Sequence, residues 1–341
     1  MSKLHFLNVK QGDCNIIEHA SGRVSMVDIC YGNGERQYAL GALGRKMVQN
    51  AIGVQGNFNM KNHPTHPLDY LGDLGINDIF RFILTHPDMD HMDGLDNLFA
   101  SKTIQNFWDS GVRRNRPDFG GGSTYSEEDW DCYQRILRNE TEAKLVGVNS
   151  GDRFSYANQP EREHDGLYIL SPNQILVDGV GDDTNDASYV LLYHSAGGKI
   201  LIPGDAHNKT WEFVLENYED DVKDCSVLLA PHHGRKSGMD YTFLNIVNPR
   251  LVLMGNSTSS KDLAYDRYRN YETITNNQAG NVVCESGSTG VEVYVENEKF
   301  ALAARRQTWN KNSQGYVHYM SIPKERNLGG QANSLKFGRG W

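Results

Sequence analysis

The segment Thr85-His86-Pro87-Asp88-Met89-Asp90-His91-Met92-Asp93-Gly94 contains four side chains able to bind a metal within six positions: His86, Asp88, Asp90 and His91. An apolar run, residues 79–84, precedes it and is typical of a buried strand. Pro87 cannot donate a ladder hydrogen bond and restricts the residue before it to extended conformations. The strand is therefore predicted to stop at His86, which leaves the four ligands on the following turn. Asp90 and His91 are expected near the start of a helix, where the dipole favours a carboxylate.

The alternative is an ordinary surface turn, because Pro, Asp and Gly are common turn residues. Other predicted strand ends argue against it. Residues 199–203 are followed by Gly204-Asp205, and the apolar run 227–230 is followed by Pro231-His232-His233-Gly234. A further strand, residues 24–27, ends at Asp28. Four strand ends that all carry acids or histidines favour a shared site over four unrelated turns.

Length and composition describe a globular chain of 341 residues, 38% hydrophobic and 23% charged. No apolar run approaches the roughly 20 residues of a membrane span, and the first residues lack the pattern of a signal peptide. The five cysteines are scattered without a C-x-x-C spacing, which favours reduced thiols in a cytoplasmic protein. The net charge of −9 argues against purely electrostatic binding of nucleic acid.

The C-terminal segment has the opposite charge. Residues 299–341 contain eight Lys or Arg and one acid, Glu325. This segment is either a solvated tail or a face that meets a phosphate-bearing partner or another protein. Strands that occur first in runs and then alternate with helices predict an α/β or α+β layered fold. We expect one catalytic domain, residues 1–300, with an insertion at about 110–165 lying over the site, and a basic extension, residues 301–341.

The order of these motifs resembles the metallo-β-lactamase-fold hydrolases. The segment from His86 to His91 is similar to their H-x-[HD]-x-D-H motif. The motifs are more similar still to those of the hydrolase domain of the DNA-uptake channel ComEC and its soluble relatives. Those proteins show V-G-Q-G-D, S-H-P-D-x-D-H, N-x-x-S, G-D and P-H-H-G-S. The corresponding segments here are residues 9–13, 85–91, 185–188, 204–205 and 231–235.

The resemblance implies a four-layer αβ/βα sandwich with two divalent ions at one edge of its sheets. It assigns His86 and Asp88 to one ion and Asp90 and His91 to the other, with Asp205 bridging them. One of His232 and His233 would complete the second ion, and its neighbour would contact the substrate or donate a proton. Asp90 and His233 are the catalytic candidates. Asp28 would fix a histidine tautomer, and the substrate-lining candidates are Gln11, Asp13, Asn185, Ser188 and Arg235.

Several positions depart from the family pattern. Asp88 stands where a histidine is commoner in the family, and Arg235 stands where a serine is usual. Many members also have a histidine between the first motif and the G-D aspartate, and His164 is the one histidine between Phe107 and His194 here. The ligand set is therefore rich in oxygen, which suits manganese, whereas zinc prefers nitrogen and sulfur. Two ions, zinc or manganese, are expected.

The leading hypothesis is a metal-dependent hydrolase of phosphodiester bonds, with a nuclease as its foremost version and a nucleic acid or nucleotide as substrate. Arg113, Arg114, Arg116 and Arg235 could contact phosphate. A second hypothesis is a hydrolase of a small phosphodiester, cyclic nucleotide or lactone. A third is a non-enzymatic partner-binding module of a defence or uptake system.

Overall fold

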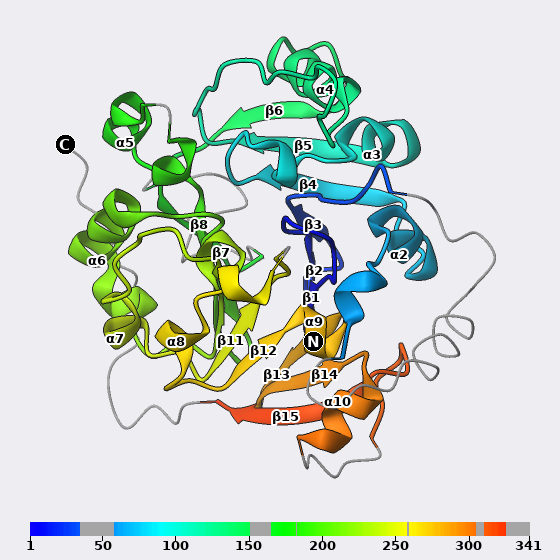
Figure 1. The fold of residues 1–341 in the computed structure, drawn as a ribbon, viewed down its shortest axis with the longest axis vertical. Helices are drawn as coiled ribbons and strands as arrows, with labels where there is room; N and C mark the ends of the chain where they lie inside the picture. Colours follow the sequence, from blue (N-terminus) through cyan, green and yellow to red (C-terminus); the bar gives the residue numbers. More distant parts are fainter. Residues whose placement is uncertain (35–57, 151–164, 182, 258, 305–309, 325–341) are drawn as a thin grey trace.

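The computed structural model describes residues 1–34, 58–150, 165–181, 183–257, 259–304 and 310–324. Its frame is two large sheets (Figure 1). The strands of the nine-stranded sheet, in spatial order, are β15 (Val317–Pro323), β14 (Gly290–Val295), β13 (Val282–Gly287), β1 (Ser2–Phe6), β2 (Asn15–Glu18), β3 (Val24–Val27), β4 (Asp78–Leu84), β5 (Thr103–Asp109) and β6 (Lys144–Gly147). The six-stranded sheet has the order β12 (Thr273–Thr275), β11 (Leu251–Met254), β10 (Val227–Leu229), β9 (Gly198–Ile202), β8 (Val190–Ser195) and β7 (Leu167–Ser171).

Helices cover the outer faces of the two sheets. Those packed against the nine-stranded sheet are α2 (Pro67–Asp73), α3 (Leu95–Ser101) and α4 (Glu127–Leu137). Those packed against the six-stranded sheet are α6 (Asn208–Val222), α7 (Leu244–Val247) and α8 (Tyr265–Tyr268). The two groups lie on opposite sides of the molecule, with the strands between them (Figure 1). The shorter helices are α5 (Gln174–Gly179), α9 (Asn276–Ala279) and α10 (Glu298–Ala303).

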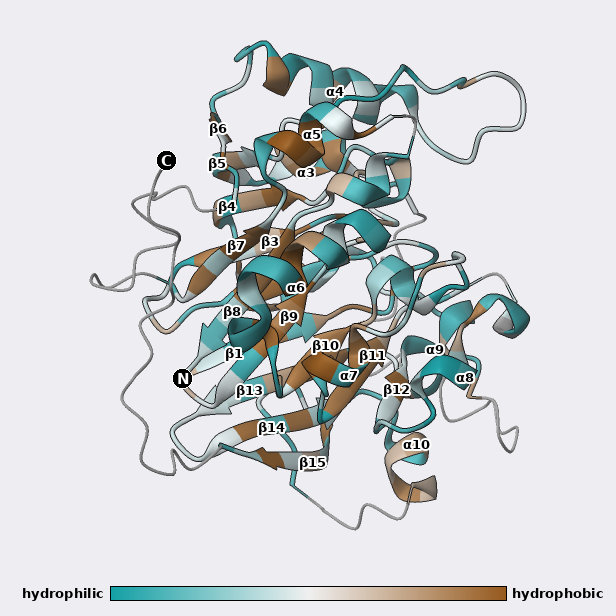
Figure 2. Ribbon diagram, turned by 90° about the vertical axis from the view of Figure 1, so that its left-hand side faces the viewer, coloured by the Kyte–Doolittle hydropathy of each residue, from teal (hydrophilic) through white to brown (hydrophobic). Residues whose placement is uncertain are grey.

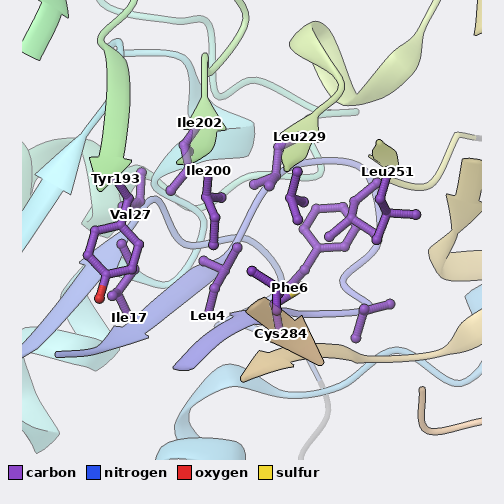
Figure 3. Close-up of a cluster of buried hydrophobic side chains, with 14 of the residues drawn as sticks. Leu4, Phe6, Ile17, Val27, Tyr193, Ile200, Ile202, Leu229, Leu251 and Cys284 are labelled. Atoms are coloured by element: carbon purple, nitrogen blue, oxygen red, sulfur yellow. The ribbon is translucent and has the colours of Figure 1, made fainter. Parts of the chain in front are cut away.

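Alternating side chains along the strands build three cores. In β4, Ile83 faces the other sheet whereas Phe82 and Leu84 face the outer helices, and in β10 Leu229 faces inward while Leu228 packs under α6. This is the period-two alternation of a pleated strand. Leu4, Phe6 and Ile17 of one sheet lie opposite Ile200, Ile202 and Leu229 of the other (Figure 3). Apolar residues are frequent on the strands, whereas much of α6 is hydrophilic (Figure 2). Each such side chain contributes about 1.5–3 kcal/mol when fully buried.

The layers are helix, sheet, sheet, helix, so the structure confirms the predicted four-layer αβ/βα sandwich. Within each sheet the strands that precede the predicted ligands are parallel: β3 pairs with β4, and β9 pairs with β10. All five cysteines are buried and free. Among the described residues no helix combines the length and apolarity needed to cross a membrane.

Strand β8 begins only at Val190, because residues Thr184–Ala187 form a 3-10 turn in which the Asp183 carboxylate accepts a hydrogen bond from the Asn185 amide. The segment predicted as an insertion contributes α4 and β6, and β6 extends the nine-stranded sheet beside β5. In the segment predicted as an extension, residues Val317–Pro323 form β15 and pair with β14.

Asp90 and His91 lie near the start of a helix, as predicted, but not in its first turn. They lie in a 3-10 turn, Met89–His91, and α3 begins four residues later. The amides of Gly94 and Asp96 at the start of α3 are instead bound by the carboxylate of Asp129 from α4. Asp129 therefore takes the capping position at the helix N-terminus and leaves the Asp90 carboxylate free to turn toward the strand ends.

Candidate metal centre

The predicted ligands come from the carboxyl ends of parallel strands. Residues 85–91 follow β4, Asp205 follows β9, His232 and His233 follow β10, and Asp28 follows β3. The carboxyl ends of parallel strands meet at one edge of a sheet, which is where α/β proteins commonly build their sites. Since β4 and β9 belong to different sheets, the site lies where the edges of the two sheets meet.

The side chains converge on Asp205. Its Oδ1 lies 3.2 Å from Nε2 of His91, and its Oδ2 lies 3.4 Å from Nε2 of His233 and 4.0 Å from Nε2 of His86. Nε2 of His233 is also 3.5 Å from Oδ2 of Asp90. The three imidazoles and Asp205 are each 3% exposed or less. Distant parts of the chain therefore present nitrogen and oxygen atoms to one small, buried space.

These atoms fit a divalent cation. Nε2 of His86, His91 and His233 and Oδ1 of Asp205 are buried, and none has a hydrogen-bond partner among the described residues. Buried polar groups are normally paired, so four that point together without hydrogen-bond partners are suited to binding a cation. Potential ligand atoms of His86, His91 and Asp205 lie within 4.8 Å of one another, as do those of Asp90, His91 and His233. Imidazole nitrogen and carboxylate oxygen are ligands of zinc and manganese.

The electrostatics of the cluster favour added positive charge. Burial opposes ionisation of Asp205, but His233 and His91 beside it hold its pKa well below its usual range. Burial likewise opposes protonation of His91, yet Asp205 and Asp28 raise its pKa well above the ordinary value. Burial and the nearby His91 lower the pKa of His86. The carboxylates thus attract protons to imidazoles in the cluster, and a metal cation can replace protons at such a site.

Carboxylates next to Nδ1 orient two of the ligand rings. Asp28 lies 2.8 Å from Nδ1 of His91 and accepts hydrogen bonds from the backbone amide (2.8 Å) and hydroxyl (2.7 Å) of Thr85. Asp13 lies 3.0 Å from Nδ1 of His233. Both carboxylates therefore favour a proton on Nδ1, which leaves Nε2 of each ring free for a metal. Thr85, which the sequence analysis did not assign, fixes the Asp28 carboxylate.

Asp88 is turned partly away from this centre. Its Oδ1 lies 2.6 Å from Nη1 of Arg114 and accepts a hydrogen bond of 2.6 Å from the hydroxyl of Thr184. Its Oδ2 is 3.9 Å from Nε2 of His86, and its side chain is 28% exposed. Asp88 is therefore near enough to share an ion with His86, but the guanidinium of Arg114 already neutralises its charge.

The two adjacent histidines occupy different positions. His233 is buried between Asp90 and Asp205, whereas the side chain of His232 is 21% exposed, with Nε2 3.7 Å from Asp205. Both have left-handed backbones (φ 54° and 57°), which are uncommon in non-glycine residues and cluster at functional sites. Nδ1 of His232 lies 3.1 Å from Nε2 of His207, another residue that the sequence analysis missed. His207 lies only two positions after Asp205, and that spacing was the available signal.

The substrate-lining candidates surround this cluster in part. Arg235 donates a hydrogen bond of 2.7 Å to the carbonyl of Gln11, and its Nη1 lies 3.9 Å from Oδ2 of Asp90. Asn185 is next in the chain to Thr184, whose hydroxyl donates a hydrogen bond to Asp88. Ser188 is buried and is next in the chain to Tyr189, whose amide donates a hydrogen bond to the carbonyl of Thr85.

Three of the arginines that were expected to contact phosphate have different partners. Arg113 pairs with Asp109 and Arg116 with Glu127, so Arg114 is the arginine of this trio that reaches the cluster. His164 lies outside the described residues.

Comparisons with known proteins add a likeness in shape. No protein-family model and no curated protein matches the chain. Among solved structures, it is similar to Igni18, a metallo hydrolase from Ignicoccus hospitalis, with 13% identity, a TM-score of 0.47, and coverage of 84% of this chain and 100% of that one. It is also similar to Tm1679, a metal-dependent hydrolase of the β-lactamase superfamily, with 12% identity, a TM-score of 0.46, and coverage of 81% of this chain and 96% of that one.

A third similar structure is YhfI from Bacillus subtilis, a metallo-β-lactamase fold protein, with 10% identity, a TM-score of 0.43, and coverage of 80% of this chain and 95% of that one. Identities and scores this low transfer no activity or substrate. The candidate centre is defined by the two sheets of this chain and by the side chains at their shared edge.

Proposed function

We propose that this chain is a metal-dependent hydrolase that cleaves phosphodiester bonds. The observation that carries the proposal is the group of buried, unpartnered ligand atoms of His86, His91, His233 and Asp205. The nearby Asp90 carboxylate belongs to the same cluster. The imidazole nitrogens lie 3.2 to 4.0 Å from the Asp205 carboxylate without well-formed hydrogen bonds to it, a spacing that leaves room for a shared cation.

The proposed ligands divide between two positions. Asp90, His91 and His233 would hold one ion, and His86 with Asp88 would hold the other, with Asp205 shared. Divalent ions bound there would activate water at neutral pH and offset the charge that develops on a phosphate. Since Arg114 pairs with Asp88, the ion near His86 is expected to be the more weakly held.

Cationic side chains at the rim favour a phosphate substrate over a neutral one. Arg235 lies beside Asp90, and Arg114 lies beside Asp88, so one guanidinium is found near each proposed ion position. His232, which is partly exposed at the same rim, is positioned to contact the substrate. A lactone would make no use of two guanidinium groups, so phosphodiesters fit this rim better.

Hydrolysis assays on the full chain would test the proposal. Purified protein, freed of metal and then loaded with zinc or manganese, should hydrolyse bis(p-nitrophenyl) phosphate and cleave plasmid DNA or RNA. Asp90→Asn should abolish both reactions while the protein stays folded by circular dichroism. Asp69→Asn, which removes a carboxylate of α2 outside the cluster, is the matched control and should keep full activity.

Two results would refute the proposal. One is the absence of phosphodiester hydrolysis with either metal in folded, metal-loaded protein. The other is undiminished activity of Asp90→Asn. Turnover of a lactone without any phosphodiester turnover would favour the small-substrate alternative.

A further inference from the structure

A cavity of about 290 Å³ lies beside the candidate metal centre and is not part of the ligand cluster. The residues that line it and matter here are Lys10, Gln11, Tyr31, Asp93, Thr124 and Tyr125. They come from four separate segments: the turn after β1, the turn after β3, the first motif after β4, and the loop before α4. A side pocket assembled from distant segments at an active centre is a natural place for the non-reacting part of a substrate.

The cavity and the metal centre lie on either side of a closely packed turn. A Cβ atom on Gly12 would lie 1.9 Å from the carbonyl oxygen of Asp90 and 2.8 Å from Cβ of Cys30, so the turn that carries Gln11 packs directly on the motif. Arg235 binds the carbonyl of Gln11 and lies beside the Asp90 carboxylate. A molecule that occupies the cavity and reaches past Gln11 and Arg235 would come to Asp90 and the proposed ions.

Two tyrosines give the cavity an aromatic character. Tyr31 has a left-handed backbone (φ 67°), held by a hydrogen bond of 2.8 Å from its amide to the carboxylate of Asp93. Tyr125, from the loop before α4, is half-buried against the outer core of the nine-stranded sheet. Aromatic side chains are platforms on which a nucleic-acid base can stack, and such stacking is tolerant of the base's identity.

The polar groups of the cavity select a neutral ring over an ion. Asp93 accepts hydrogen bonds from Tyr31 and from the side chain of Asn33, and its negative charge would repel a second phosphate. The ammonium of Lys10 lies 4.6 Å from the ring centroid of Tyr31, so it would repel a quaternary ammonium group. The remaining side chains, Gln11, Thr124 and Tyr125, offer neutral donors and acceptors of the kind that bind the edge of a base.

We propose that this cavity binds the base of a nucleotide whose phosphate lies at the metal centre. This deepens the proposed function and rests on it for the position of the phosphate. The cavity volume is near the lower end of the range for small-molecule sites, about 300–1,000 Å³, so it suits one nucleoside. The substrate class is then a nucleotide-containing phosphodiester held by one base, such as the end of a strand or a small nucleotide ester.

Equilibrium binding separates this inference from the proposed reaction, because it requires no turnover. Titration calorimetry of the full, zinc-loaded chain would compare adenosine 5′-monophosphate with ribose 5-phosphate, which lacks the base. We expect the nucleotide to bind at least about fivefold more tightly, the lower range for one stacked base. Tyr125→Ala should reduce this preference to about twofold or less, and Tyr125→Phe, which keeps the ring, should retain most of it.

Tyr265→Ala is the matched control, because Tyr265 is 40% exposed and does not line the cavity. It should preserve the full preference. Equal binding of the two ligands, no binding of either, or an undiminished preference in Tyr125→Ala would overturn the inference. So would a Tyr125-dependent preference for phosphocholine over adenosine monophosphate. Failure of phosphodiester hydrolysis, by contrast, would refute the proposed reaction and leave the measured base preference standing.

Discussion

Nη1 of Arg114 lies 2.6 Å from Oδ1 of Asp88, so an arginine of the loop after β5 neutralises a carboxylate of the first ligand motif. Asp88 stands where many metallo-β-lactamase-fold proteins have a histidine, and its second oxygen is 3.9 Å from His86. The guanidinium and a metal ion would therefore compete for the same carboxylate. This relationship makes the affinity of the His86 position depend on a residue that is not itself a ligand.

Replacing Arg114 should strengthen metal binding. The side chains of Arg114 and Asp88 are 33% and 28% exposed, and ion pairs of this kind are worth about 0.2–1 kcal/mol. Arg114→Gln should therefore lower the dissociation constant of the weaker ion roughly 1.5- to 5-fold in a zinc or manganese titration. Arg113→Gln, which breaks the neighbouring pair with Asp109, is the control and should leave that constant unchanged. Weaker metal binding in Arg114→Gln would contradict the competition.

Removing the charge of Asp28 should weaken metal binding. Asp28 is fully buried, and its carboxylate meets three groups: the amide and hydroxyl of Thr85 and Nδ1 of His91. An asparagine would turn an amide N–H toward donors and would release the His91 ring. Loss of such a partner typically costs 10–100-fold in metal affinity, so chelator competition should show a decrease of about that size in Asp28→Asn. Asp109→Asn, at the end of β5, which is separated from β3 by β4 in the same sheet, should not show it. An unchanged affinity in Asp28→Asn would show that Thr85 alone orients the ring.

A side chain at Gly12 should destabilise the protein. The added Cβ would meet the Asp90 carbonyl at 1.9 Å, and a backbone atom cannot move aside as a flexible side chain can. Overpacking of this kind costs about 1–3 kcal/mol, so urea denaturation of Gly12→Ala should show a loss in that range together with weaker metal binding. Gly72→Ala is the matched control, because a Cβ in α2 meets nothing within 4 Å. That substitution should stabilise by up to about 0.5–1 kcal/mol. Equal stability of wild type and Gly12→Ala would show that the two turns separate readily.

His19 should make the fold sensitive to acid. Burial and the charge of Arg81 lower the pKa of His19 to about 3, against the opposing effect of Asp165, and its two ring nitrogens lie 3.0 Å from the Asp165 carbonyl and 2.7 Å from the Ser25 hydroxyl. Between the unfolded pKa of about 6.5 and this value, the unfolded chain binds a proton that the folded chain excludes. Stability is therefore retained above pH 6.5 and lost as the pH falls toward 3, at up to about 1.4 kcal/mol per pH unit.

The free energy of unfolding, measured between pH 7 and pH 4, would test this prediction. His19→Gln removes the titrating ring and should show a shallower loss of stability than wild type across that interval. His194→Gln, at an exposed position of β8, should keep the wild-type slope. Parallel curves for wild type and His19→Gln would contradict the assigned proton linkage.

The local chemistry of the site could be predicted from the sequence because it is carried by short segments. The end of β4 before the first motif follows from Pro87 and the apolar run that precedes it. Asp28, Asp205 and the pair His232 and His233 became candidates from their positions after apolar strands, and their roles were implied by the family resemblance. Asp90 and His91 lie near the start of α3, as expected, but the first amides of that helix are bound by Asp129, which lies 39 positions beyond Asp90 in the chain. No local pattern could have revealed that contact.

Strand periodicity and turn chemistry act over a few residues. Local patterns were therefore enough to predict the layered α/β class, the strand ends and the identity of most residues near the cluster. Tertiary structure alone decided that Arg114 pairs with Asp88, that His233 is buried while His232 stays at the rim, and that Tyr31 and Tyr125 share a cavity. These relationships depend on how two sheets and their connecting loops pack together. Such packing is set by the summed burial of many side chains, which no single segment encodes.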